Sequence, residues 1–104
     1  MQFNPYGSSP AGYQQIADLS EAVGLTVPTA VSVKTGTAVI FAEAQDVRWR
    51  DDGDDPTTTI GMLLKAGAEF TYQGDLSAIK FIEVTSGAVL NVSYYNAVNG
   101  ILLP

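Results

Sequence analysis

The sequence of 104 residues contains no cysteine and no histidine. Without cysteine the chain has no disulfide framework and no thiolate chemistry, which is compatible with folding in a reducing cytoplasm. Without histidine, the serine–histidine and cysteine–histidine nucleophile arrangements are excluded, and so are histidine-bearing metal sites. Because these absences remove most of the common catalytic constellations, we expect a protein that is not an enzyme and that has no catalytic residue, bound metal or cofactor.

Charged residues are also scarce, at 15% of the chain, against roughly 25% in an average soluble domain. The 11 acids and 5 bases give a net charge of −6, which argues against a nucleic-acid partner because phosphate binding needs clustered Lys and Arg. The negative balance also repels acidic lipid headgroups, and no apolar run reaches the length of about 18 residues that indicates a membrane span. We expect a soluble protein whose charge-poor surface is partly covered by neighbouring subunits.

The length is that of a single domain with one hydrophobic core. Apolar residues make up 46% of the chain and form short runs, separated by turn signals about every ten residues. This pattern predicts an all-β fold, an antiparallel β-sandwich of jelly-roll-like type with seven to eight short strands and very little helix. We expect the sandwich at residues 22–96, an N-terminal arm at residues 1–21 and an apolar C-terminal tail at residues 97–104.

The chain is organised around residues 38–64, where two apolar runs flank a dense turn signal. The strict alternation at residues 47–50 is typical of a strand with one buried face. Asp52 and Gly53 together predict a tight hairpin turn, because glycine adopts positive φ without steric cost, and Pro56 reinforces the loop. We interpret these three residues as structural turn residues rather than as a reactive site.

Further short runs predict the remaining strands. The last two predicted strands are separated only by a Thr-Ser-Gly turn, which predicts a hairpin. The runs lie at residues 22–27, 30–34, 37–43, 57–64, 69–73, 78–84 and 88–95.

The four aspartates of residues 51–55 and the nearby Trp49 are the closest approach to a chemical motif. In an exposed turn all four carboxylates would be ionised, so none is suited to act as a general acid. The alternating spacing of a calcium loop and its distal glutamate are absent. We favour a solvated turn balanced by Arg48 and Arg50. A carbohydrate- or calcium-binding module that uses Trp49 and this loop is the less favoured alternative.

Large apolar side chains near the two ends are candidates for contacts with other proteins. The N-terminal arm has isolated aromatics among Gly, Ser, Pro and Gln, and it is either a loose end or an arm that lays these aromatics on a neighbour. Three aliphatic residues at the C-terminus would expose apolar surface unless they pack against a sheet. Tyr94 and Tyr95 face opposite sides of the last strand, so that one is buried and the other is free for an interface. The protein-interface candidates are Phe3, Tyr6, Tyr13, Tyr95, Ile101, Leu102 and Leu103.

Four segments resemble a family of small proteins encoded among the virion structural genes of tailed bacteriophages. They are VRWRDDG at residues 47–53, PTTTIGMLL at residues 56–64, GDLSAIKFI at residues 74–82 and LNVSYY at residues 90–95. The resemblance extends over residues 22–95 and leaves both ends outside it. It carries no catalytic or binding residue to this chain.

The resemblance implies a β-sandwich that is made in the host cytoplasm and assembles on the virion. Its implied role is that of a capsid decoration or cement protein, which stabilises the head by bridging subunits of the major capsid protein. The alternative role in the same setting is a head–tail, tail or fibre-base accessory protein. Because cement proteins occupy symmetry points of the capsid, we expect a homo-oligomer, with a trimer favoured at three-fold sites.

Overall fold

The computed structural model describes residues 8–97 of the chain. These residues form eight strands and contain no helix, so no helix there is long and apolar enough to cross a membrane. The strands are β1 (Ser8–Ile16), β2 (Val23–Gly24), β3 (Thr37–Glu43), β4 (Val47–Arg50), β5 (Met62–Leu64), β6 (Glu69–Tyr72), β7 (Lys80–Glu83) and β8 (Val89–Ala97).

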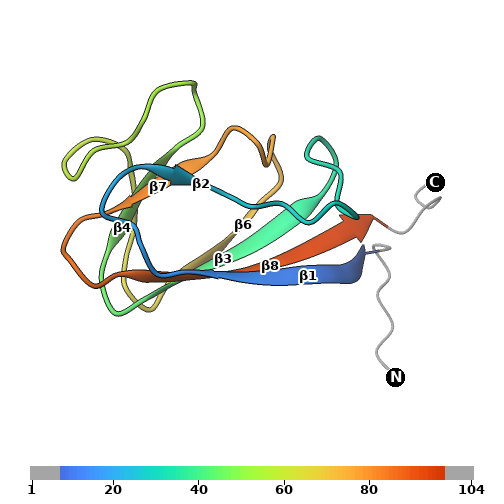
Figure 1. The fold of residues 1–104 in the computed structure, drawn as a ribbon, viewed down its shortest axis with the longest axis horizontal. Coiled ribbons are helices and arrows are strands. Elements are labelled where there is room, and N and C mark those ends of the chain that lie inside the picture. The colour runs from blue at the N-terminus through green and yellow to red at the C-terminus, as the bar shows by residue number, and fades with distance from the viewer. Residues whose placement is uncertain (1–7, 98–104) are drawn as a thin grey trace.

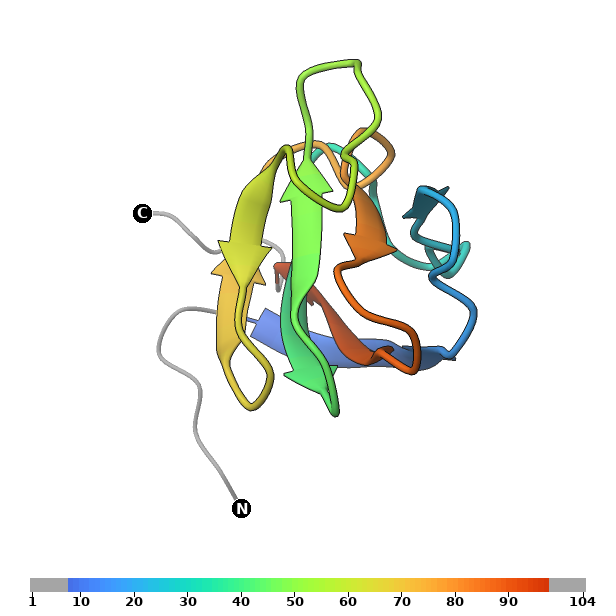
Figure 2. The same ribbon diagram turned by 90° about the vertical axis from the view of Figure 1, so that its left-hand side faces the viewer.

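The strands form two antiparallel sheets that pack face to face (Figures 1 and 2). One sheet has the order β1-β8-β3-β6 and contains the long strands. The other has the order β2-β7-β4-β5, and its strands are two to four residues long. The predicted all-β antiparallel sandwich is confirmed, and the number of strands is eight.

The stretch predicted to organise the chain, residues 38–64, forms most of one long hairpin, which continues to β6 and bends from the first sheet into the second. β3 pairs with β6 in the first sheet, and β4 pairs with β5 in the second, where Trp49 lies opposite Met62. At the bend Ala44 has a φ of 77°, and Asp46 Oδ1 accepts a hydrogen bond from the Ala66 amide at 2.8 Å. The two sheets are therefore joined through this hairpin, whose tip is the loop at residues 51–61.

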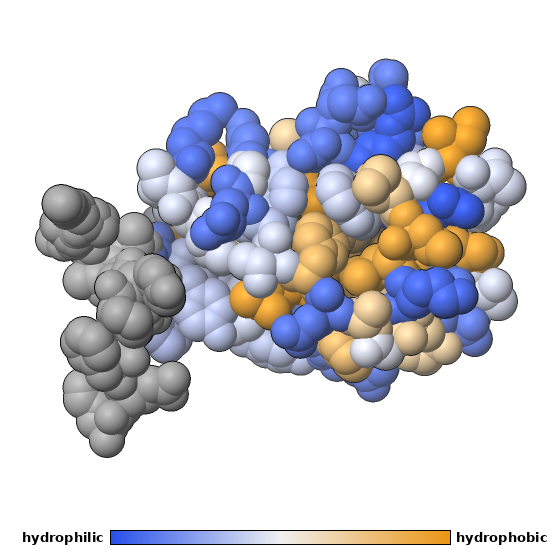
Figure 3. Space-filling view, turned by 180° about the vertical axis from the view of Figure 1, so that it is seen from behind, coloured by the Kyte–Doolittle hydropathy of each residue, from blue (hydrophilic) through white to orange (hydrophobic). Residues whose placement is uncertain are grey.

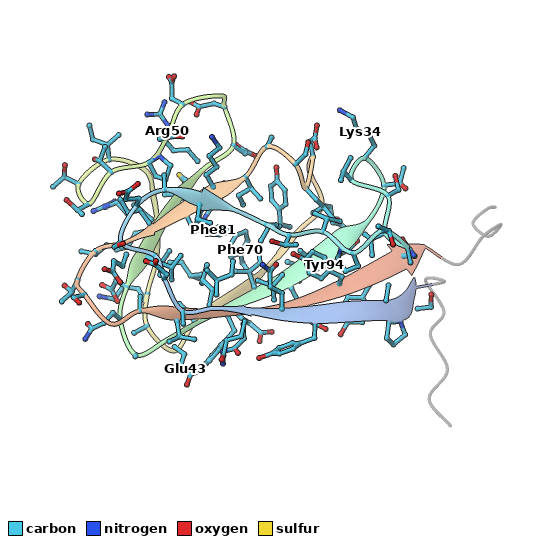
Figure 4. All side chains as sticks on the ribbon, viewed as in Figure 1. Lys34, Glu43, Arg50, Phe70, Phe81 and Tyr94 are labelled. Carbon is cyan, nitrogen blue, oxygen red and sulfur yellow. The ribbon has the colours of Figure 1, made fainter. Side chains whose placement is uncertain are left out.

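The core lies between the inner faces of the two sheets. Three aromatic rings connect the sheets at the side where β5 and β6 are the edge strands: Trp49 stacks on Phe70 with ring centroids 5.1 Å apart, and Tyr72 meets both rings edge-on. Figure 4 shows Phe70, Phe81 and Tyr94 pointing into this interior. The largest fully buried side chains are Tyr94, Phe81, Leu19, Ile40, Leu76, Ile79, Leu90, Val47 and Val92.

An N-terminal arm was predicted at residues 1–21. The prediction is wrong for residues 8–16, which form a strand of the sheet. Strand β1 has little apolar alternation because a polar and a small residue replace large side chains on its inner face. Gln14 accepts a hydrogen bond from the buried Tyr94 hydroxyl at 2.7 Å. Gly12 leaves room for Pro28, whose Cγ would lie 2.8 Å from an added Cβ. Leu19, beyond the strand, is fully buried.

The hairpin predicted for residues 78–95 is also wrong. β7 pairs with β2 and β4, whereas β8 pairs with β1 and β3, so residues 84–88 cross from one sheet to the other. The Thr-Ser-Gly signal identifies a reversal of the chain, but it does not say whether the next strand joins the same sheet. The β run predicted at residues 30–34 consists of turns, and those at residues 22–27 and 57–64 shorten to β2 and β5.

Candidate functional site

The sheet β1-β8-β3-β6 contains no Lys or Arg in any of its strands. Its only charged residues are Glu43 and Glu69, which lie at the end of β3 and the start of β6. The opposite sheet carries Arg48, Arg50 and Lys80 in its strands. The molecule therefore has one nearly uncharged sheet and one charged sheet.

The outer surface of the uncharged sheet, which we call the neutral face, combines aromatic, aliphatic and small polar side chains. Register places Tyr13, Ser93, Val39 and Thr71 in one row across the four strands. The next row along the strands contains Gln15, Asn91, Phe41 and Glu69. Val39 and Phe41 are half-buried rather than fully covered, so the face presents apolar surface with no cation and with acids only at its margin.

Two of the predicted interface residues lie on the neutral face. Tyr13 is 64% exposed, and its hydroxyl donates a hydrogen bond to Asn91 Oδ1. Tyr95 is half-buried and lies opposite Thr37, whereas its neighbour Tyr94 is fully buried. The opposite orientation of the two adjacent tyrosines is confirmed.

The other five interface candidates lie outside the described residues: Phe3, Tyr6, Ile101, Leu102 and Leu103. The position of the two ends can nevertheless be stated. Ser8 pairs with Ala97 in the β1–β8 ladder, so both end segments attach at neighbouring points of one end of the uncharged sheet (Figure 1). Any contact that these segments make with other molecules starts from that end.

The predicted acidic turn is a wide loop at residues 51–61 rather than a tight hairpin turn. Arg50 binds Asp52 through two hydrogen bonds, Nε to Oδ1 at 3.0 Å and Nη2 to Oδ2 at 2.6 Å. Arg50 also lies 3.4 Å from Asp54, and Lys80 lies 3.1 Å from Asp55. Three of the four loop aspartates therefore lie within ion-pair distance of a cation, and both cations belong to the neighbouring strands β4 and β7.

The base of this loop is held by Arg48 and by the close packing around Gly61. The Arg48 guanidinium donates to the carbonyls of Thr58 and Gly61, at 3.2 and 2.8 Å. Gly61 has a φ of 138° and lies against Trp49 and Pro56, which is buried. Gly53 has a φ of 97° with open space around it. The predicted balance of the acids by both arginines is thus only half right, because Arg48 binds backbone carbonyls.

A shallow hollow of about 230 Å³ lies beside the loop and is lined by Trp49, Arg50, Asp51, Asp52, Ile60, Gly61 and Met62. Ile60, Met62 and Leu63 near it are 56%, 59% and 47% exposed. Figure 3, which views the molecule from behind, shows apolar residues gathered on the right-hand part of that face. The ring of Trp49 is stacked on Phe70 and half-buried, so it is not a free platform for a sugar ring.

Hydrogen bonds and burial perturb the acid–base behaviour of two groups near the loop. Hydrogen bonds from Lys34 and Ser77 lower the pKa of Asp75 to about 2. Burial, together with the hydrogen bond that its hydroxyl donates to Asp51 at 2.8 Å, raises the pKa of Tyr72 to about 12. Neither shift produces a group that exchanges protons near neutral pH, and both are explained by structural contacts.

Among residues 8–97 no group of three or more acidic side chains is arranged to hold a metal ion. The carboxylates of residues 51–55 point to different partners, since Asp51 accepts from Tyr72 while Asp52 and Asp55 pair with Arg50 and Lys80. Binding Ca²⁺ there would require these existing contacts to break.

The residues that sequence reasoning missed are Val39 and Phe41 on the neutral face and Ile60, Met62 and Leu63 near the hollow. The sequence alone held no signal for the first two, because the absence of Lys and Arg from this sheet becomes apparent only once its four strands are known to be neighbours. What the arrangement offers chemically is a surface of aromatic, aliphatic and small polar side chains without a cation. Comparisons of the chain with protein-family models, with curated proteins and with solved structures found no match.

Proposed function

We propose that the chain is a non-enzymatic structural protein of a tailed-bacteriophage virion, where it decorates the capsid surface and stabilises the head by bridging subunits of the major capsid protein. The observation that carries this proposal is the neutral face. A sheet of four strands with no Lys or Arg presents Tyr13, Val39, Phe41 and Tyr95 on its outer side. Such a surface loses little charge solvation when another protein covers it.

The distribution of charge supports contact with protein rather than with nucleic acid. In the described structure four of the five basic side chains are in ion pairs with aspartates, and Arg48 is occupied by backbone carbonyls. Four of the cations are therefore already paired with acids, and a phosphate backbone would meet a surface on which acids outnumber bases. This supports a protein that sits outside the packaged DNA.

The placement of the chain ends supports a bridging role. Because Ser8 and Ala97 are neighbours, seven residues at each end start from the same end of the sandwich. Two ends that leave the sandwich side by side suit a protein that bridges subunits as a homo-oligomer, for which a trimer is the natural form at three-fold sites.

Labelled electron microscopy of the phage particles tests the proposal. An antibody against the chain, detected with gold particles, should label the whole head surface in a regular pattern. Label confined to the neck, tail or fibre base would move the chain to the alternative accessory role. Absence of the chain from particles purified on a density gradient, measured by mass spectrometry, would remove the virion role altogether.

A further inference from the structure

Strand β1 forms a long border of the uncharged sheet, with nothing paired to its outer side. It is the first strand in the order β1-β8-β3-β6 and spans nine residues, Ser8–Ile16. The other three edge strands, β2, β5 and β6, are two, three and four residues long. Figure 1 shows β1 along the lower border of the molecule with no strand beyond it.

The outward-pointing backbone groups of β1 have no backbone partner in the described structure. Within residues 8–97, the only backbone ladder of this strand is the one to β8. The nearest covering segment contacts β1 through side chains, since the Thr26 amide donates to Gln14 Oε1 and Pro28 lies over Gly12. A row of free amide and carbonyl groups is a template for another strand.

Sequence features that normally prevent such pairing, such as a proline or a β-bulge, occur only in the first part of β1. Pro10 lacks a donor, and the ladder is interrupted by a bulge between Pro10 and Gly12. After the bulge, residues 12–16 run in regular register as Gly-Tyr-Gln-Gln-Ile with neither a charge nor a proline. Edge strands that stay single usually carry lysine, proline or a bulge along their length.

The charge of the chain identifies the partner that this edge fits. Two copies of a chain with a net charge of −6 repel each other least where both surfaces are uncharged, and residues 12–16 of β1 carry no charge. A partner of opposite charge would instead gain from contact with the acidic loops. In addition, two copies of one strand can pair antiparallel around a two-fold axis. Such a contact uses the same surface on both copies, so the chain needs no separate complementary surface.

We propose that residues 12–16 of β1 pair antiparallel with the same residues of a second copy, so that the two four-stranded sheets become one continuous eight-stranded sheet. This inference rests on the proposed function in one respect, that copies of the chain associate with one another, and it specifies one contact through which they do so. Because the contact is two-fold, it joins copies in pairs, and in a trimeric assembly it would connect one trimer to the next.

Sedimentation equilibrium of the purified full-length chain tests the pairing. The native chain should form assemblies of even copy number, and Tyr13→Lys should raise the dissociation constant at least tenfold because the two-fold axis brings the two new charges together. Tyr13 is mostly exposed, so the monomer should stay folded, as circular dichroism would show. Thr71→Lys on β6, the other edge of the same sheet, is the matched control and should leave assembly unchanged.

Cysteine cross-linking gives a second readout, because the native chain has no cysteine. Under mild oxidation, chains carrying Tyr13→Cys together with Gln15→Cys should form covalent dimers, whereas Thr71→Cys chains should not. A monomer at every concentration, or an assembly that Tyr13→Lys leaves intact and the β1 cysteines do not cross-link, would overturn the pairing. Virions that carry the chain, together with a monomer in solution, would refute only this contact, whereas a β1-paired dimer absent from virions would refute only the proposed function.

Discussion

Among single residues, Gly61 is the one whose replacement should most disturb the loop at residues 51–61. Its φ is 138°, and an added Cβ would lie 3.1 Å from the Trp49 carbonyl oxygen and 3.2 Å from Arg48 Cβ. Gly53 also has positive φ, 97°, but its added Cβ would meet nothing within 4 Å. Replacing each glycine with alanine therefore distinguishes two free-energy costs: backbone strain alone at position 53, and strain together with steric crowding at position 61.

We predict that Gly61→Ala lowers the free energy of unfolding by about 2 kcal/mol or more, and that Gly53→Ala lowers it by about 1 kcal/mol. The difference arises because only position 61 adds steric contacts to the strained φ. Urea denaturation of both variants measures the two values. Equal losses would show that crowding at Gly61 is relieved by movement of the loop.

Asp75 should make the stability of the protein depend on pH in acid. Its folded-state pKa is lowered to about 2 from 3.8, first by the hydrogen bond from Lys34 and then by those from Ser77. A lowered pKa means that the ionised form stabilises the fold, so this contribution is present above pH 3.8 and is lost as the pH falls toward 2. Asp75→Asn should flatten the decline of melting temperature over that interval.

Lys34→Met is the companion variant for this measurement. It removes the ion pair but leaves the Ser77 hydrogen bonds, so it should flatten the acid decline less than Asp75→Asn does. If both variants follow the native curve between pH 4 and 2, Asp75 does not contribute to acid stability in the way its contacts imply.

At the scale of single residues, sequence reasoning predicted orientation better than contacts. The alternation rule predicted that Tyr94 and Tyr95 point to opposite faces, because the side-chain period of a strand depends on local backbone geometry alone. It did not predict that Arg48 binds the carbonyls of Thr58 and Gly61, because that contact depends on how a loop of eleven residues folds back on its own hairpin.

At the scale of elements, β3 and β6 offer a direct test of which face is the core. Phe70 on β6 lies on the inner face and stacks on Trp49, while Phe41 on β3 lies on the neutral face opposite Glu69. We predict that Phe70→Ala lowers the free energy of unfolding by about 2–3 kcal/mol, since the ring is half-buried, and that Phe41→Ala lowers it by less than about 1 kcal/mol. Thermal or urea denaturation of the two variants measures both losses. A larger loss for Phe41→Ala than for Phe70→Ala would contradict the prediction.

Also at this scale, the existence of strands was predictable but their partners were not. Residues 37–43 and 69–72 have clear β patterns and form strands. β1 was missed because only Ile16 on its inner face is a large apolar residue, while Gln14 and Gly12 contact a distant tyrosine hydroxyl and a distant proline. The separation of β7 from β8 was missed because a turn signal carries no information about which sheet receives the next strand.

At the scale of the whole molecule, the main feature is the division between one sheet without cations and one sheet with charged strands. The total charge of −6 was visible in the sequence, but its placement was not, since β1, β8, β3 and β6 are neighbours only in the fold. This division gives the neutral face its proposed role as the surface that contacts capsid protein, and it leaves the charged sheet facing solvent.

The most direct test of this role is the binding of the purified chain to expanded capsids that lack it. Co-sedimentation measures the affinity of the native chain, of the Phe41→Glu variant and of Leu63→Glu as the control. Phe41 lies on the neutral face, whereas Leu63 is an exposed apolar residue of the charged sheet. We predict saturable binding of the native chain, a loss of at least tenfold in affinity for Phe41→Glu and native affinity for Leu63→Glu. Absence of binding by the native chain, or equal binding by all three proteins, would contradict the proposal that the neutral face holds the molecule on the capsid.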